Sequence, residues 1–223
     1  MSRGPRLVLL GKQGAGKGTQ AARLAERYGI EHVSTGDLFR AAAAAGTPAG
    51  REAEQYMNRG DLVPDDLTLR IVEERFAEDG LVDQGFVLDG FPRTLTQAEK
   101  LEDVLEGHPL DLVINLDVPT EIVLDRIARR RVCEKCGTTY HVNAPPKSDW
   151  TCDVCGGRVV QREDDTEDAV MRRLELYEEE TVPIIDFYLK LGKLVAVDGT
   201  GDGDEVFARL VKPVEQRLKP LQT

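Results

Sequence analysis

Long apolar stretches are missing from this sequence of 223 residues. No uninterrupted run of about 18 apolar residues occurs, so we expect no membrane-spanning helix. The first apolar run, at residues 6–10, is too short for the core of a signal peptide and ends at a glycine-rich loop. These absences favour a cytoplasmic protein.

Positive charge and histidine are also scarce. The chain carries 29 Lys and Arg residues against 40 Asp and Glu residues, which gives a net charge of −11. Broad nucleic-acid binding neutralises phosphates over a large surface, and such an acidic chain is a poor candidate for it. A phosphorylated small molecule would instead need arginines concentrated near loops. The three histidines, His32, His108 and His141, form no convincing catalytic constellation, and we expect structural or surface roles for them.

Short apolar runs alternate with stretches of helical periodicity along most of the chain. The predicted strands are 6–10, 30–33, 85–88, 110–116 and 193–197, and the predicted helices are 16–28, 37–45, 48–58, 65–78, 94–106, 120–131, 166–191 and 204–218. The length suits one sizeable core with room for a small insert. We therefore predict an α/β fold, a five-stranded parallel sheet with helices on both faces.

Each predicted strand ends in a polar or glycine-rich loop. The five loops are Gly-Lys-Gln-Gly-Ala-Gly-Lys, Ser-Thr-Gly-Asp, Asp-Gly-Phe-Pro-Arg, Asp-Val-Pro and Asp-Gly-Thr-Gly. Any one of them could be a simple turn, because turns favour Gly, Asp and Pro. Ligands of parallel sheets bind beyond the carboxyl ends of the strands, so five such loops on one edge predict a binding site there.

The loop after the first predicted strand, GKQGAGKGT at residues 11–19, is typical of a phosphate-binding loop. Main-chain N–H groups of one short segment can surround a phosphate at a helix start: Gly14, Ala15, Gly16, Lys17, Gly18 and Thr19. Lys17 would place its ammonium against the outer phosphates. The common motif has a hydroxyl directly after the lysine to hold Mg²⁺, whereas here Gly18 follows and Thr19 comes one position late. A glycine-containing turn without a ligand is the alternative.

Six arginines lie near the predicted loops or around the irregular segment 132–165. They are Arg40, Arg93, Arg126, Arg130, Arg162 and Arg173. Guanidinium groups suit phosphate oxygens, and Arg126 and Arg130, four residues apart, would share one face of the predicted helix 120–131. Any single one could be a solvated surface residue. Together, in an acidic chain, they predict binding of more than one phosphate group.

All four cysteines lie in segment 132–165, which lacks a clean helical or strand period and is interpreted as an inserted subdomain. Cys133-x₂-Cys136 and Cys152-x₂-Cys155, fifteen residues apart, form a pattern typical of tetrahedral zinc. Two disulfides or idle thiols are the alternatives, which a cytoplasmic location disfavours. Four protein ligands leave no open position, so the predicted metal is structural. Zinc and iron are not distinguished by the pattern.

Five segments together resemble the adenylate kinases, in the bacterial long form with a zinc-type lid, within the nucleoside monophosphate kinases. They are GKQGAGKGTQ, STGDLFR, LDGFPRT, RRRVCEKCG…CDVCGG and DDTEDAVMRRL, and the resemblance runs from the first strand to the turn at Asp198. It implies a P-loop fold and reversible, Mg²⁺-dependent transfer of the γ-phosphoryl group of ATP to AMP, giving two ADP. It also implies a monomer that serves adenine nucleotide homeostasis. The nucleophile would be a phosphate oxygen with a pKa near ~6, so no general base is needed.

The resemblance also implies roles for individual residues. Lys17 and the amides of residues 14–19 would hold the donor phosphates, while Arg130 and Arg162 would bridge the donor and the transferring phosphoryl group. Arg40, Arg93 and Arg173 would clamp the AMP phosphate and the developing charge. Asp89 would be the outer-shell carboxylate of Mg²⁺, and the ATP side would further include Arg126, Thr139, Tyr140 and Gly201. The AMP side would include Thr35, Asp61, Leu62, Val63, Gly90, Phe91, Pro92, Gln97 and Arg162.

Thr35 and Gln97 would recognise the adenine of AMP, because a glutamine amide offers both a donor and an acceptor to that base. Within the single P-loop core, 1–223, segment 34–63 would be a mobile AMP-binding insert. Segment 129–165 would be the zinc-binding lid, with Asp164 and Asp165 pairing with arginines at its return hinge. Closure of both would exclude water. The resemblance also explains Gly18. Two nucleotides bring several phosphates to Mg²⁺ and Asp89 can reach its waters, so a hydroxyl ligand for Mg²⁺ directly after Lys17 is less necessary.

Two alternatives remain at this point. The first is a kinase for another nucleoside monophosphate, or one with GTP as donor. The second is a nucleotide-gated zinc-ribbon module that contacts nucleic acid. The second predicts a basic, aromatic ribbon, whereas segment 132–165 contains several acids and only Tyr140 and Trp150 as aromatic residues. We therefore expect binding of ATP, AMP and ADP, and of neither nucleic acid nor membrane.

Overall fold

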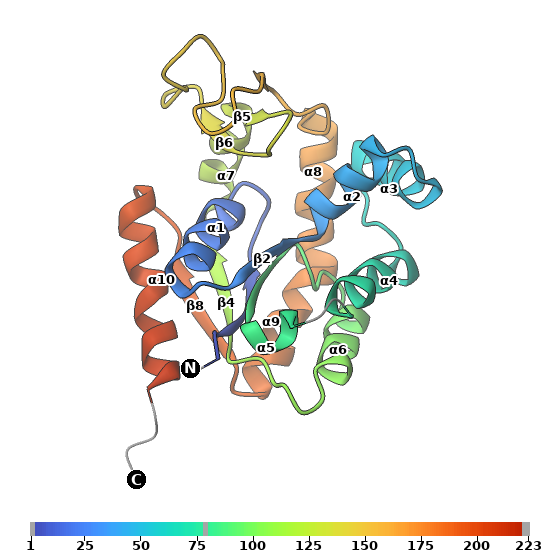
Figure 1. Ribbon diagram of the computed structural model, residues 1–223, viewed down its shortest axis with the longest axis vertical. Helices are drawn as coiled ribbons and strands as arrows, with labels where there is room; N and C mark the ends of the chain where they lie inside the picture. The colour runs from blue at the N-terminus through green and yellow to red at the C-terminus, as the bar shows by residue number, and fades with distance from the viewer. Residues whose placement is uncertain (1–2, 78–79, 220–223) are drawn as a thin grey trace.

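A central parallel sheet organises the chain in the computed structural model, which describes residues 3–77 and 80–219 (Figure 1). Its strands are β1 (Arg6–Leu10), β2 (Glu31–Ser34), β3 (Phe86–Asp89), β4 (Leu112–Asp117) and β8 (Leu194–Asp198), in the order β2-β3-β1-β4-β8. All neighbouring pairs are parallel. The predicted five-stranded parallel sheet is confirmed, with boundaries displaced by one or two residues.

Helices cover both faces of this sheet. They are α1 (Lys17–Tyr28), α2 (Thr35–Ala44), α3 (Pro48–Arg59), α4 (Asp65–Phe76), α5 (Leu81–Gln84), α6 (Leu95–Val104), α7 (Thr120–Ala128), α8 (Glu167–Leu176), α9 (Val182–Lys190) and α10 (Gly203–Leu218). The short α5 was not expected from the sequence, and Glu78, expected to end a helix, lies outside the described residues. Within the described ranges, no helix combines the length and apolar character needed to cross a bilayer.

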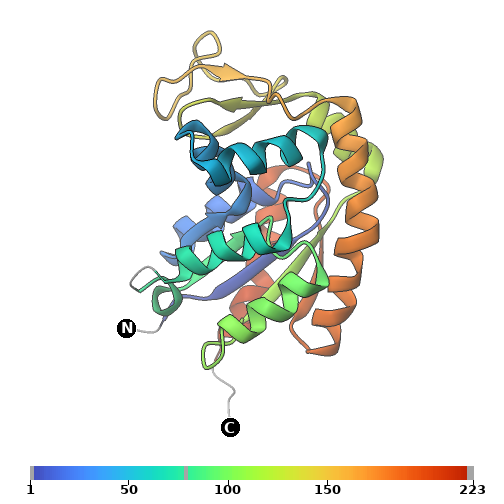
Figure 2. The same cartoon turned by 90° about the vertical axis from the view of Figure 1, so that its right-hand side faces the viewer.

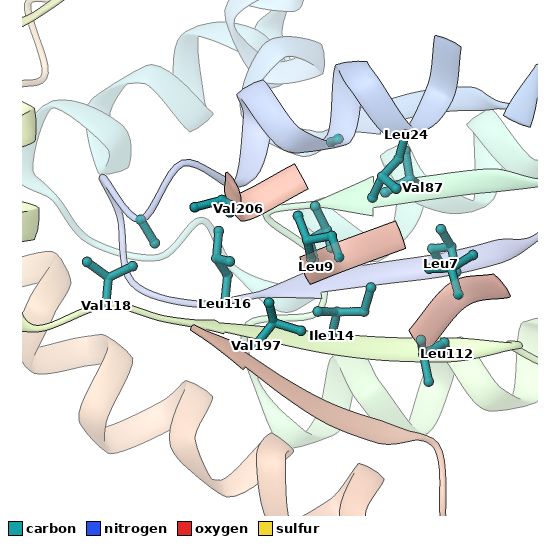
Figure 3. Close-up of a cluster of buried hydrophobic side chains, with 14 of the residues drawn as sticks. Leu7, Leu9, Leu24, Val87, Leu112, Ile114, Leu116, Val118, Val197 and Val206 are labelled. Atoms are coloured by element: carbon teal, nitrogen blue, oxygen red, sulfur yellow. The ribbon is translucent and has the colours of Figure 1, made fainter. Parts of the chain in front are cut away.

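Strand β1 shows why both faces are covered. Side chains alternate between the faces of a strand, and here every position of β1 is buried. Leu7 and Leu9 belong to the cluster that α1 and α10 cover, through Leu24 and Leu210 (Figure 3). Val8 and its neighbours on the opposite face belong to a second cluster with residues of α6 and α9. The P-loop that follows β1 is therefore anchored at the centre of the protein.

The predicted helix 166–191 is wrong as one continuous α-helix. Between α8 and α9 the chain forms a π-helical turn, Tyr177–Thr181. Pro183 stands in the first turn of α9, and a proline has no N–H for the regular helical hydrogen bond. The π-helical turn therefore accommodates the hydrogen bond that Pro183 cannot make. Helical periodicity in the sequence does not reveal this break.

The segment around the cysteines forms a small antiparallel sheet of its own. Its strands are β5 (Arg130–Cys133), β6 (Thr139–His141) and β7 (Val159–Val160), in the order β6-β5-β7. Figures 1 and 2 show it at one end of the molecule, above the main sheet and beside the start of α8. The predicted helix 120–131 is wrong at its end, because α7 stops at Ala128 and Arg130 begins β5.

Candidate functional site

One large cleft, of about 1980 Å³, lies between the main sheet, α2–α3 and the small sheet. Loops after β1, β2, β3 and β8 contribute to its wall. The fifth loop, after β4, does not line it, and Val118 of that loop is buried in the core. Pockets for one drug-sized ligand are about 300–1000 Å³, so this cleft has room for two nucleotides.

Glycine-loop residues form the floor of the cleft at the start of α1. Gly14 and Gly16 have φ of 82° and 102°, a backbone conformation that favours glycine. A Cβ at Gly14 would also lie 2.6 Å from Ile127, so the loop can pass this close only without a side chain. Gly16 caps α1 with no side-chain hydrogen bond, which leaves the first amides of the helix available to an anion.

Lys17 lies half-buried beneath this loop. Its Nζ donates to the carbonyl oxygens of Gly11 and Lys12 at 2.7 and 2.9 Å. Burial lowers the pKa of Lys17 to about 8, and the positive charges of Arg93 and Arg130 act in the same direction against Asp89. The ammonium is thus still largely protonated at neutral pH but poorly neutralised, a state that a bound phosphate would stabilise.

Gly18 lies next to the carboxylate of Asp89 at the cleft. A Cβ added at Gly18 would lie 3.2 Å from Asp89 Oδ2, so a carboxylate stands beside the position where the common motif has its hydroxyl. Burial works to raise the pKa of Asp89, but the His32 ring and the charges of Lys17 and Arg93 outweigh it and lower that pKa. Asp89 is therefore ionised at neutral pH and can accept hydrogen bonds from metal-bound water.

The six arginines singled out in the sequence all line the cleft. Arg93 Nε donates to Gly90 O at 2.8 Å, and Arg173 donates to Asp164 Oδ2 at 2.7 Å and to Met57 O at 2.6 Å. Burial lowers the pKa of Arg162 to about 10, with the charges of Arg40 and Arg130 adding to the effect. Such mutual repulsion indicates a concentration of positive charge that phosphate groups would relieve.

Asp164 and Asp165, at the return from the small sheet, hold these arginines. Arg130 Nε donates to Asp165 Oδ2 at 2.9 Å, and Arg130 Nη2 pairs with Asp165 Oδ1. The side chain of Asp165 is fully buried, and Gln13 Nε2 donates to its Oδ1 at 3.1 Å. Gln13 was missed in the sequence, where a glutamine inside a phosphate-binding loop carries no signal of a partner 152 positions away.

The residues assigned to ATP from the sequence gather around Arg126. Its guanidinium donates to Ala15 O and Gly199 O, both at 3.0 Å, and to Gly201 O at 3.4 Å. It thereby joins the glycine loop to the loop after β8. Thr139, Tyr140 and Gly201 also line the cleft, as do Gly14, Ala15, Gly16, Lys17, Gly18 and Thr19. The residues assigned to ATP from the sequence are therefore together.

Most residues assigned to AMP from the sequence lie between α2–α3 and the loop after β3. The cleft is lined there by Thr35, Arg40, Asp61, Leu62, Val63, Gly90, Pro92, Arg93 and Gln97. Thr35 Oγ1 donates to Gly90 O at 2.9 Å, and Arg40 pairs with Asp37. Phe91 is the exception among the assigned residues, because its side chain packs in the core with only 1% exposed. Gln97 is nearly buried and bonds to Asp65, a residue not singled out in the sequence.

The histidines lie apart from one another. His32 Nε2 is 3.9 Å from Asp89 Oδ2 and lines the cleft. His108 Nδ1 is 3.2 Å from Arg6, and His141 Nδ1 accepts from the N–H of Asn143 at 3.1 Å. These positions bring no two histidines into one catalytic constellation.

The four cysteine sulfurs converge in the small sheet. All lie within 4.8 Å of one another, and the thiols of Cys133, Cys136, Cys152 and Cys155 are unbridged. The Sγ–Sγ distances are 3.4 Å for Cys133–Cys155 and 3.6 Å for Cys136–Cys152. Four sulfurs at about 2.3 Å from a tetrahedral zinc ion would be about 3.8 Å apart, so the donor set fits zinc.

Comparisons with known proteins agree with this geometry. A family profile described as "Adenylate kinase" matches residues 9–193. The adenylate kinase of Thermodesulfovibrio yellowstonii is 51% identical over 215 residues, covering 95% of this chain and 100% of the relative. The adenylate kinase of Bacillus subtilis is 51% identical, covering 91% and 94%. That of Clostridium tetani is 47% identical, covering 92% and 95%.

Proposed function

The chain belongs to the adenylate kinase family, and we propose that it performs the family's reaction with the residues gathered in the cleft. It transfers the γ-phosphoryl group of ATP reversibly to AMP, giving two ADP. The observation that supports this assignment of residues is the convergence of Lys17 and six arginines on one cleft large enough for two nucleotides.

On the ATP side, the open amides of the glycine loop bind the donor phosphates and Lys17 neutralises the outer ones. Lys17 must leave the carbonyls of Gly11 and Lys12, and phosphate oxygens replace these acceptors. The attacking group is a phosphate oxygen of AMP, already largely ionised at neutral pH because its second pKa is near ~6. The protein therefore supplies position and positive charge rather than a base.

Arginines supply that charge around the transferring phosphoryl group. Arg93 and Arg173, with Arg40, hold the AMP phosphate, and Arg130 and Arg162 reach towards the donor from the small sheet. Asp164 and Asp165 would keep Arg173 and Arg130 aligned at the cleft, a role that their ion pairs support. Charge that develops in the transition state meets guanidinium groups already in position, which is the main source of rate in phosphoryl transfer.

Two metal ions belong to this proposal. Mg²⁺, bound with ATP, would neutralise phosphate charge, and Asp89 would orient its waters from the position beside Gly18. Zinc would be held by the four cysteines and would have a structural role, because four protein ligands leave no position for substrate. Backbone N–H groups in the knuckles support this fit: Gly137 and Gly156 donate to the carbonyls of Cys133 and Cys152 at 3.0 and 2.9 Å.

Segments 34–63 and 129–165 are proposed to close over both nucleotides, as an AMP-binding insert and a lid on the core. Segment 129–165 has a small apolar cluster of its own, which supports movement as a unit, whereas the cluster of segment 34–63 also includes Leu67 of α4. We further propose a cytoplasmic monomer that binds neither nucleic acid nor membrane, on the strength of its net charge of −11. Lid closure would exclude water, which competes with AMP for the phosphoryl group.

An assay with AMP, CMP, UMP and GMP as acceptors, each with ATP and with GTP as donor, tests the proposal. We expect ATP with AMP to give the highest kcat/KM. Thr35 and Gln97 line the acceptor end of the cleft, and an amide there suits adenine. Faster turnover of UMP than of AMP would contradict the acceptor assignment, and faster turnover with GTP would contradict the donor assignment.

A further inference from the structure

The amide of Gln97 is held at both ends by the protein. Its Nε2 donates to Asp65 Oδ1 at 2.7 Å, and its Oε1 accepts from the main-chain N–H of Arg93 at 2.8 Å. The residue is 1% exposed, yet it lines the acceptor end of the cleft. Each end of the amide still has one hydrogen-bonding position left, one N–H and one lone pair.

These partners determine which way the amide points. An ionised carboxylate only accepts hydrogen bonds and a main-chain N–H only donates them. If the Gln97 amide rotated by half a turn, its oxygen would face the Asp65 carboxylate and its NH₂ would face the Arg93 N–H. Both hydrogen bonds would become repulsive contacts in a buried place, which is costly.

Asp65 is itself fixed by the start of helix α6. Thr94 Oγ1 donates to Asp65 at 3.0 and 3.2 Å and accepts from the N–H of Gln97 at 3.2 Å, as the N-cap of α6. Asp65 is the first residue of α4, so this contact joins α4 to α6 beside the cleft. The carboxylate therefore keeps one position relative to the Gln97 amide.

A fixed amide distinguishes purines by the group at position 6 of the ring. Adenine carries an NH₂ donor there, next to the N1 acceptor, whereas hypoxanthine and guanine carry an oxygen acceptor next to an N1–H donor. One orientation of an amide complements the first pattern, and only the opposite orientation complements the second.

We propose that Asp65 is a specificity-determining positioning residue that restricts the acceptor to 6-aminopurine nucleotides by locking the orientation of the Gln97 amide. The inference rests on the proposed function, in which Gln97 contacts the base of the acceptor nucleotide. Asp65 touches no substrate in this account. It discriminates by making the amide orientation needed for IMP or GMP unfavourable.

The test compares kcat/KM for AMP and for IMP in Asp65→Asn. An asparagine can turn either an acceptor or a donor towards Gln97, so one of the two contacts that oppose the reversed amide orientation is removed, while the main-chain N–H of Arg93 still opposes it. We expect the AMP:IMP ratio of kcat/KM to fall by about tenfold, the scale of one hydrogen bond to a charged group, with loss for AMP and gain for IMP. A purely structural defect would lower kcat/KM for AMP and for IMP by the same factor and leave their ratio unchanged. That result would overturn the proposal.

Asp66→Asn is the matched control. Asp66 is the exposed neighbour in the same first turn of α4, so its variant makes the same charge change at the helix N-terminus. The AMP:IMP ratio should stay at the wild-type value in Asp66→Asn, and an equal fall there would overturn the proposal. Should Asp65→Asn not fold, Asp65→Ser keeps a good helix-start residue while removing the carboxylate, and the same fall in ratio is expected.

Gln97→Ala separates this inference from the function on which it rests. It should reduce kcat/KM for AMP strongly and bring the AMP:IMP ratio towards one. If Gln97→Ala leaves AMP kinetics unchanged, the acceptor-site assignment itself fails. If Gln97→Ala impairs AMP but Asp65→Asn keeps the wild-type ratio, only the role of Asp65 is overturned.

Discussion

The main sheet and the small sheet of residues 130–160 face the same cleft but are stabilised in different ways. Around the main sheet, two large clusters of buried apolar side chains include every position of β1 from Leu7 to Leu10 and, through Ala15, the glycine loop. The buried residues of the small sheet's cluster are Cys133, Cys152 and Val159. A core this small contributes little burial free energy, and in the proposed function thiolate–metal bonds would replace apolar contacts there.

In the proposed function, this difference separates two tasks. The region of the main sheet binds the phosphates, and the region of the small sheet controls access to the cleft. The glycine loop and Lys17 belong to the region with the large core, which holds the backbone of the loop in place. Arg130 and Arg162 belong to the region that we propose moves as a unit, a region whose apolar cluster is its own. Changes in the first region should remove activity and preserve stability, whereas loss of metal from the second should do the reverse.

Lys17→Ala should have the largest effect. We expect kcat to fall by about a thousandfold, because loss of a charge on the transferring phosphates costs on that order in phosphoryl transfer. The melting temperature should change little, since Lys17 bonds only to carbonyls of its own loop. Steady-state kinetics and thermal unfolding measure both.

Lys12→Ala is the control from the same loop, because Lys12 pairs with Thr120 and Glu178 instead of facing the cleft. Its kcat should stay within about threefold of wild type, as expected for a partly exposed pair. Wild-type turnover in Lys17→Ala would contradict the assignment of the donor loop.

Arg130→Lys should have an intermediate effect and tests the moving region. Lysine keeps the charge but loses the planar fork, so we expect kcat to fall by about a hundredfold. Arg131→Lys changes the next residue of β5, which bonds to the carbonyls of Ala128 and Arg130. Because adjacent strand residues face opposite sides, Arg131→Lys should be nearly neutral. An equal fall in kcat in the two variants would show that β5 tolerates neither substitution. It would contradict a specific role for the Arg130 guanidinium.

Metal removal should have the smallest effect on the initial rate. Elemental analysis should find one zinc ion per chain. A strong chelator should lower the melting temperature by about 5 °C or more, since about 1 kcal/mol shifts a protein of this size by 2–4 °C. The initial rate at low temperature should fall only a few-fold. Immediate and complete loss of activity in a protein that remains folded would instead indicate a catalytic metal.

Much of the fold could be predicted from the sequence because its signals are local. The strands of the main sheet are short, apolar and buried on both faces, so their existence follows from composition, with errors of one or two residues at the ends. The helix predicted at 120–131 was wrong only at its end, because a charged stretch at Arg129–Arg131 fits a helix or an exposed strand equally well. The break at Tyr177–Thr181 depends on hydrogen bonding that Pro183 prevents.

The sequence by itself determined the glycine loop, the cysteine spacing and the residue types needed for phosphate binding, because each is encoded within a few neighbouring positions. Only the tertiary structure decided which partners these residues have. Asp89 stands beside Gly18, Gln13 reaches Asp165, and Gln97 is held by Asp65. These partners are 71, 152 and 32 positions apart, counting Asp89 minus Gly18 for the first. Hydrogen bonds and charges act over a few ångströms of space, and folding alone brings such distant positions within that range.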